Sequence, residues 1–133
     1  MVEPAADLRS KLERSREFFR SGVTRNPAAR RRNLDRLAES IRRHENEILA
    51  ALQADLGKCA FESYASEIGF VFEEIKYLRR RLRRWTKRRR VSTPLVHFPS
   101  RSYIVPEPIG TVLILSPWNY PFQLAISPLI GAI

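Results

Sequence analysis

Apolar residues in the first 90 positions recur every three or four residues, which predicts a series of amphipathic helices. The longest apolar stripe comprises Ile68, Val71, Phe72, Ile75, Leu78, Leu82 and Trp85. The predicted helices also have recognisable ends. Gly22 and Gly57 are placed as C-terminal stops, and Asn26 followed by Pro27 is a typical helix start. A break is expected near His44, so residues 1–90 are predicted to form several helices in series.

The pattern changes after residue 90. Residues 91–110 contain four prolines, which exclude a helix and predict an extended arm of edge strands or a hairpin. Residues 111–115, with the sequence TVLIL, form an uninterrupted apolar run of the kind found in a parallel strand buried on both faces. Helical character resumes near Pro121 and continues to Ile133, with a kink expected at Pro128.

This order of elements predicts an α/β fold class. A buried strand followed by a helix is the first half of a βαβ unit, and here it is preceded by N-terminal helices and an extended arm. The predicted strand at residues 111–115 has no partner strand in the sequence, and a central strand without a neighbour leaves its backbone groups unpaired. We therefore expect this chain to be the truncated N-terminal piece of a longer protein.

The net charge of +10 comes from one short run. Nine of the twelve residues from Arg79 to Arg90 are Lys or Arg, whereas residues 1–78 carry a balance of +1 and residues 91–133 a balance of zero. One hypothesis is a basic helical module that binds nucleic acid or an anionic membrane through this run. We favour a solvated helix face instead, because only Trp85 interleaves with the cations and it continues the apolar stripe.

The remaining composition excludes several classes of protein. A single cysteine, Cys59, gives no internal disulfide, and with only two histidines, His44 and His97, we expect no metal site. No stretch reaches the ~20 apolar residues that cross a bilayer, and no secretory signal is recognisable at the N-terminus. A cytoplasmic location is expected.

The candidate site follows the predicted strand, at residues 116–120, because open α/β sheets bind ligands beyond the carboxyl ends of their strands. Asn119 has two interpretations. It is either the N-cap of the helix that begins near Pro121, or a neutral donor to the oxyanion that forms when a nucleophile adds to a carbonyl. Both interpretations can hold together. Trp118 is either a core aromatic residue or a wall of a ligand pocket.

The sequence PEPIGTVLILSPWNYPFQLAISPLIGAI resembles the aldehyde dehydrogenase superfamily, specifically its class 3 type, and so do the upstream ALQADLGK and FVFEEIKYL. The resemblance covers essentially the whole chain. It implies oxidation of an aldehyde to a carboxylic acid with NAD or NADP, through a cysteine thiohemiacetal and thioester. It also implies that residues 111–133 are the first buried strand and the start of the next helix of a Rossmann-like NAD(P)-binding domain.

The resemblance further assigns roles to single residues. Asn119 matches the side chain that donates to the oxyanion, and Tyr120 matches a tyrosine near the path by which the aldehyde enters. The residues expected beside the cofactor are Leu115, Ser116, Pro117 and Trp118. The arm, residues 92–105 within the extended segment 91–110, matches the part that pairs subunits, so a homodimer is expected.

The resemblance also identifies what these 133 residues lack. In the family, the nucleophilic cysteine, the glutamate base and the phosphate-contacting glycines align beyond Ile133. Cys59 lies far from the nucleophile position and no motif supports its activation, so we expect it to be structural. The isolated chain is therefore predicted to be inactive.

Overall fold

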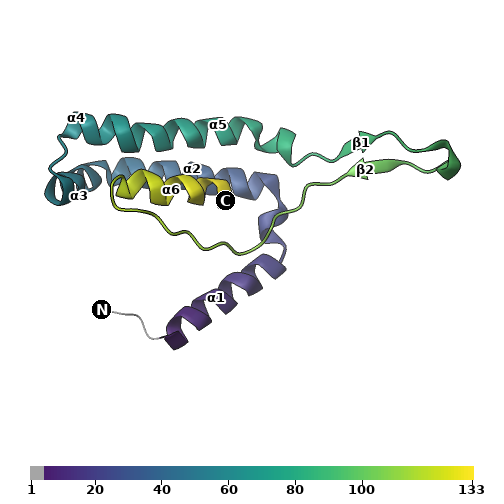
Figure 1. Ribbon diagram of the computed structural model, residues 1–133, viewed down its shortest axis with the longest axis horizontal. Coiled ribbons are helices and arrows are strands. Elements are labelled where there is room, and N and C mark those ends of the chain that lie inside the picture. Colours follow the sequence, from purple (N-terminus) through teal and green to yellow (C-terminus); the bar gives the residue numbers. More distant parts are fainter. Residues whose placement is uncertain (1–4) are drawn as a thin grey trace.

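The structure is a computed structural model and describes residues 5–133. Its helices and strands, in chain order, are α1 (Ala5–Arg20), the 3-10 turn η1 (Val23–Arg25), α2 (Pro27–Arg43), α3 (Glu45–Leu56), α4 (Ala60–Ser63), the π-helical turn η2 (Tyr64–Ile68), α5 (Gly69–Trp85), β1 (Arg89–Val91), the 3-10 turn η3 (Leu95–His97), β2 (Ser102–Ile104) and α6 (Pro121–Ala132). Helices α2, α5 and α6 lie side by side, while α1 lies apart from them and the β1–β2 hairpin projects beyond the end of α5 (Figure 1).

The core lies between α2, α5 and α6. Its buried members are Leu34, Ala38, Ile41, Ile68, Val71, Ile75 and Ile130. The stripe predicted from the sequence therefore supplies the α5 side of the core, and the partly buried Phe122 and Ile126 pack onto it from α6. Its last predicted member, Trp85, is an exception, because it is 46% exposed at the end of α5. By contrast, α1 leaves Leu8 and Leu12 exposed.

The helix ends predicted from the sequence are confirmed. Gly22 and Gly57 both adopt the left-handed conformation after a helix, with φ of 76° and 67°. The side chain of Asn26 accepts a hydrogen bond of 2.9 Å from the backbone N–H of Ala28, with Pro27 at the first helical position. His44 separates α2 from α3, as expected.

A π-helical turn interrupts the long helix that precedes the hairpin. The N–H of Gly69, the residue after η2, bonds to the carbonyl of Tyr64, five residues earlier. This wider turn coincides with two fully buried neighbours, Glu67 and Ile68. Gly69 allows the close approach, because a Cβ there would lie 3.1 Å from the Tyr64 carbonyl oxygen. Turns of this kind are frequent at functional sites.

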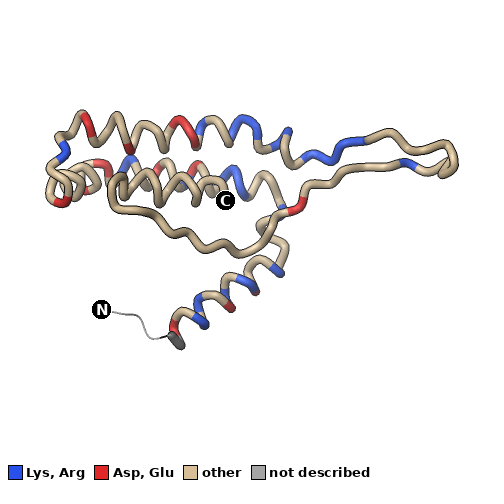
Figure 2. Tube along the Cα trace, in the orientation of Figure 1, with Lys and Arg blue, Asp and Glu red and all other residues tan. Residues whose placement is uncertain are grey.

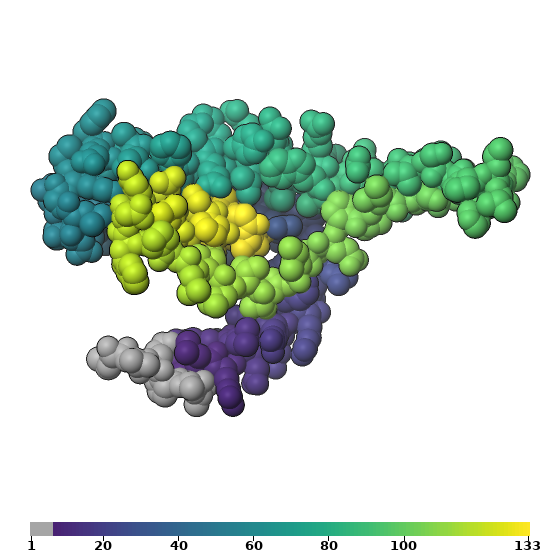
Figure 3. Space-filling view, in the orientation of Figure 1, coloured from purple at the N-terminus to yellow at the C-terminus, as the bar shows by residue number. Residues whose placement is uncertain are grey.

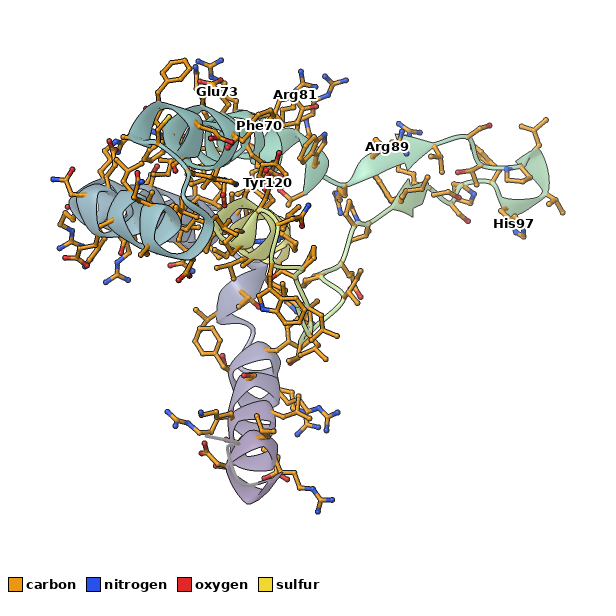
Figure 4. The ribbon with its side chains drawn as sticks, turned by 60° about the vertical axis from the view of Figure 1, so that its left-hand side comes forward. Phe70, Glu73, Arg81, Arg89, His97 and Tyr120 are labelled. Atoms are coloured by element: carbon orange, nitrogen blue, oxygen red, sulfur yellow. The ribbon has the colours of Figure 1, made fainter. Side chains whose placement is uncertain are left out.

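The predicted arm is a hairpin, and its first strand begins at Arg89, two residues before the predicted segment 91–110 and within the part predicted to be helical. Strands β1 and β2 are antiparallel, with Arg89 opposite Ile104 and Val91 opposite Ser102. Figure 3 shows the hairpin standing clear of the rest of the molecule. Its far end, which carries His97 (Figure 4), exposes Leu95, Val96 and Phe98 almost fully.

Residues 111–115 form no buried parallel strand in this chain, as the lack of a partner strand in the sequence led us to expect. These residues are extended, but no strand among residues 5–133 pairs with them. Leu113 and Leu115 are 83% and 84% exposed. The physical reason is that a strand obtains its hydrogen bonds and its cover from neighbours, whereas a helix bonds within itself. The chain is therefore mostly helical with one two-stranded sheet, rather than a formed α/β sheet.

Within residues 5–133, each helix is too short or too polar to span a bilayer.

Candidate active-site segment at the start of α6

The site residues predicted from the sequence form one surface segment that leads into α6. Leu115 and Trp118 are 84% and 85% exposed, Pro117 and Asn119 are also exposed, and only Ser116 is partly buried. Trp118 is therefore not a core residue in this chain. The predicted site residues therefore lie together at the surface.

Asn119 does not cap α6. The residue in the cap position is Tyr120, and its side chain makes no capping hydrogen bond. Among the described residues, the Asn119 side-chain amide has no hydrogen-bond partner, whereas its backbone carbonyl does (Lys58, below). The prediction that Asn119 is the N-cap is thus wrong. The helix starts one residue later than that interpretation required, and another side chain does the capping.

That side chain is Glu67, from the π-helical turn. Its Oε2 accepts hydrogen bonds from the backbone N–H groups of Phe122, at 2.9 Å, and Gln123, at 3.2 Å. These are first-turn donors that have no partner within the helix, and Pro121 has no N–H to offer. A carboxylate also suits the positive end of the helix dipole. Because Glu67 is fully buried, it anchors α6 firmly against η2.

Lys58 completes the arrangement. Its Nζ lies 2.6 Å from Glu67 Oε1, donates to the backbone carbonyl of Asn119 at 3.3 Å, and sits 4.0 Å from the centre of the Tyr120 ring. The Lys58 side chain is only 10% exposed. Figure 4 shows Tyr120 at the start of α6, next to α5. One ammonium group therefore contacts both residues that lead into the helix.

Lys58 and Glu67 were not identified from the sequence, although a signal was present. Glu67 precedes Val71 by four residues and Ile75 by eight, so it lies on the apolar face of its helix. Charged residues are almost never fully buried without a partner, so a glutamate in this stripe indicates a buried cation nearby. Spacing alone could not identify Lys58, because it lies in the loop that follows Gly57.

The residues predicted to contact the cofactor do not enclose a dinucleotide. Cavities of about 740, 500 and 460 Å³ lie elsewhere, and none is lined by residues 115–118. A cofactor pocket normally buries most of its ligand. Because most of their side chains are exposed, residues 115–118 form at most one wall of such a pocket. The described residues also contain no group of three or more metal-ligating side chains.

The basic run occupies the end of α5 and continues into β1, where Lys and Arg dominate the chain (Figure 2). Three of its cations contact neighbouring groups. Arg79 Nε lies 2.9 Å from Asp35 Oδ1, and the guanidinium groups of Arg81 and Arg88 lie over the rings of Tyr77 and Tyr103, at 4.3 and 4.5 Å. Such contacts are typical of a solvated face. Binding of nucleic acid or an anionic membrane stays a hypothesis.

Comparison with known proteins identifies the chain's relatives. The model of the aldehyde dehydrogenase family matches residues 3–133. The 4,4'-diaponeurosporen-aldehyde dehydrogenase of Staphylococcus aureus is 48% identical over 126 residues, which are 95% of this chain and 28% of that protein. Aldehyde dehydrogenase family 3 member H1 of Arabidopsis thaliana is 43% identical over 129 residues, 97% of this chain and 26% of that protein.

A solved structure of an aldehyde dehydrogenase also matches this chain. The substrate-bound state of Staphylococcus aureus AldH superimposes with a TM-score of 0.90 at 47% identity, over 94% of this chain and 27% of that one. The chain thus spans about a quarter of the length of the relatives it matches. It belongs to the aldehyde dehydrogenase family, and it corresponds to the N-terminal part of class 3 type members.

Proposed function

We propose that this chain supplies the oxyanion donor of an NAD- or NADP-dependent enzyme that oxidises aldehydes to carboxylic acids. The nucleophilic cysteine and the base would come from the three quarters of the family's length that these residues do not cover. The observation that supports this proposal is the state of Asn119: its amide is exposed and unbonded, while its backbone carbonyl is held by Lys58.

The chemistry of an amide suits this role. When a thiolate adds to an aldehyde, the carbonyl oxygen becomes negative, and an N–H donor already in place stabilises that charge without reorganisation. The Asn119 amide is neutral, so it donates without titrating, and no hydrogen bond with the described residues must be broken first. A carboxylate of the same shape would repel the oxyanion.

The neighbouring residues would serve binding. Residues 115–118 would form one wall of the dinucleotide site, with Leu115 and Trp118 offering apolar surface for it to cover. Tyr120 would line the path of the aldehyde, with its ring held against the Lys58 ammonium.

The test uses the complete gene product that contains residues 1–133, with aldehyde oxidation followed by the absorbance of the reduced dinucleotide. Asn119→Ala should lower kcat by roughly 10²- to 10³-fold, the usual loss on removing one oxyanion donor. Asn119→Asp should lose at least as much, because a carboxylate cannot donate. The matched control is Asn46→Ala, at an exposed asparagine of α3, which should leave kcat unchanged.

Two outcomes would contradict the proposal. Wild-type turnover in Asn119→Ala would remove the oxyanion role. An inactive but folded wild-type gene product, tested against aliphatic and aromatic aldehydes with both dinucleotides, would remove the proposed activity itself.

A further inference from the structure

We infer that the buried Lys58–Glu67 pair is a positioning unit for Asn119, and this inference rests on the proposed function. It concerns two residues outside the segment predicted to meet the substrate. Neither would touch the aldehyde; both would act by fixing the backbone from which the oxyanion donor extends.

The first step is the anchor. Glu67 holds α6 at its first turn through two N–H groups, at 2.9 and 3.2 Å. Because it comes from η2, which also contributes Ile68 to the core, the start of α6 is fixed relative to the most buried part of the molecule. Asn119 lies only two residues before this helix.

The second step is the tether. An ammonium group has three N–H donors, and those of Lys58 have three partners: the Glu67 carboxylate, the Asn119 carbonyl and the face of the Tyr120 ring. Lys58 therefore joins the anchored carboxylate to both residues that precede α6. Beyond the tether, four of residues 111–115 are exposed and none of the five pairs with a strand among residues 5–133, so no sheet restrains Asn119 from that side.

The third step is what this arrangement leaves free. Asparagine before a helix commonly uses its side chain as the cap, which fixes the amide against the helix. Here Glu67 satisfies the helix donors, so the helix does not set the orientation of the Asn119 amide while its backbone is restrained. Capping from a distant residue therefore separates the support of α6 from the proposed chemistry of Asn119.

Burial supports positioning over simple stabilisation. Glu67 is fully buried and Lys58 is 10% exposed, whereas the exposed pair Lys76–Glu73 has side chains that are 50% and 72% exposed. A buried ion pair loses much of its attraction to desolvation, so it is weak evidence for stability. Its contribution is a defined geometry.

The experiment replaces the pair in the complete gene product by Lys58→Met/Glu67→Gln. Glutamine keeps an oxygen for the helix N–H groups, and methionine keeps the apolar stem, so mainly the tether is lost. We expect kcat to fall by about 10- to 100-fold, the effect of a small misplacement of a catalytic group, with KM for the dinucleotide little changed. The control, Lys76→Met/Glu73→Gln, should stay within about twofold of wild type, because exposed pairs contribute little.

The deciding measurement repeats the pair variant in the Asn119→Ala background. If the pair acts through Asn119, its effect should shrink to within about twofold there, because coupled residues are not additive. The same loss in both backgrounds would overturn the inference, since the pair would then act on the fold at large. An unchanged kcat in a folded pair variant would overturn it as well.

A second measurement needs neither activity nor a variant. Backbone ¹⁵N relaxation of the 133-residue chain should show Asn119 nearly as ordered as α6, and clearly more ordered than the exposed, untethered Leu113. Asn119 as mobile as Leu113 would overturn the inference. An inactive wild-type gene product with an ordered Asn119 would contradict the proposed function but leave the tether standing.

Discussion

Two apolar regions of this chain differ in solvent exposure. The apolar face of α5 is buried, with Val71 at 0% and Ile75 at 4% exposure. Residues 111–115 are at least as apolar, yet Leu113 is 83% exposed. Figure 3 shows this second region as part of a single run of chain that passes between the α2–α5–α6 core and α1.

The difference lies in where the hydrogen bonds come from. Helix α5 satisfies its backbone internally, so it needs only a partner for one face, and α2 and α6 supply that partner. An extended segment satisfies its backbone only through neighbouring strands, and the described residues offer residues 111–115 none. An apolar segment therefore needs cover for its side chains and hydrogen-bond partners for its backbone. The neighbouring elements determine whether it has them.

The largest expected effect contrasts two leucines. In the 133-residue chain, Leu34→Ala should lower the free energy of unfolding by about 2–5 kcal/mol, because Leu34 is only 1% exposed and its loss leaves a cavity. Leu113→Ala should cost less than about 0.5 kcal/mol, because the side chain is already in water. Urea unfolding followed by far-UV circular dichroism measures both.

The same two variants test the segment in the complete gene product. If a neighbouring strand and helices cover residues 111–115 there, the cost of Leu113→Ala should rise toward that of Leu34→Ala. A large cost already present in the 133-residue chain would show that the segment is buried in solution, and would contradict the exposure described above.

A smaller effect distinguishes the two asparagines that precede helices. Asn26→Ala should lower the stability of the chain by about 1 kcal/mol, because its side chain accepts from the Ala28 N–H at 2.9 Å. Asn119→Ala should change it by less than about 0.5 kcal/mol, because Asn119 makes no such bond and Glu67 caps α6. Equal costs, measured by the same unfolding assay, would restore Asn119 as a cap.

The sequence predicts features set by neighbours along the chain better than features set by distant residues. Features that depend on neighbours along the chain were predicted correctly: the α5 stripe as far as Leu82, the Asn26 cap, the glycine stops and the break at His44. The hairpin was predicted as one of two forms of the arm, because prolines exclude a helix without specifying strand pairing.

Features that depend on distant residues were not predicted. Asn119 before a proline has the local pattern of a cap, but Glu67, 55 residues before Phe122 in sequence, takes that role. Similarly, nothing local indicates that Lys58 reaches Asn119, 61 residues later. Only the place of Glu67 on an apolar face pointed to a buried pair.

The smallest expected effect on stability concerns the hairpin, a third apolar surface that is exposed like residues 111–115. Leu95 and Phe98 are 90% and 83% exposed at its end, far from the helical core (Figure 1). We propose that this end pairs subunits in a homodimer. Leu95→Ser/Phe98→Ser should therefore change the unfolding free energy of the 133-residue chain by less than about 0.5 kcal/mol, because no core contact is lost. In the complete gene product the same change should shift sedimentation from dimer toward monomer, because serine removes the apolar area that association would bury.

Ser100→Ala, at an exposed serine of the same turn, is the control and should leave the dimer intact. A dimer that persists in the double variant would assign subunit pairing to another surface, and residues 111–115 would then be the next apolar segment to test.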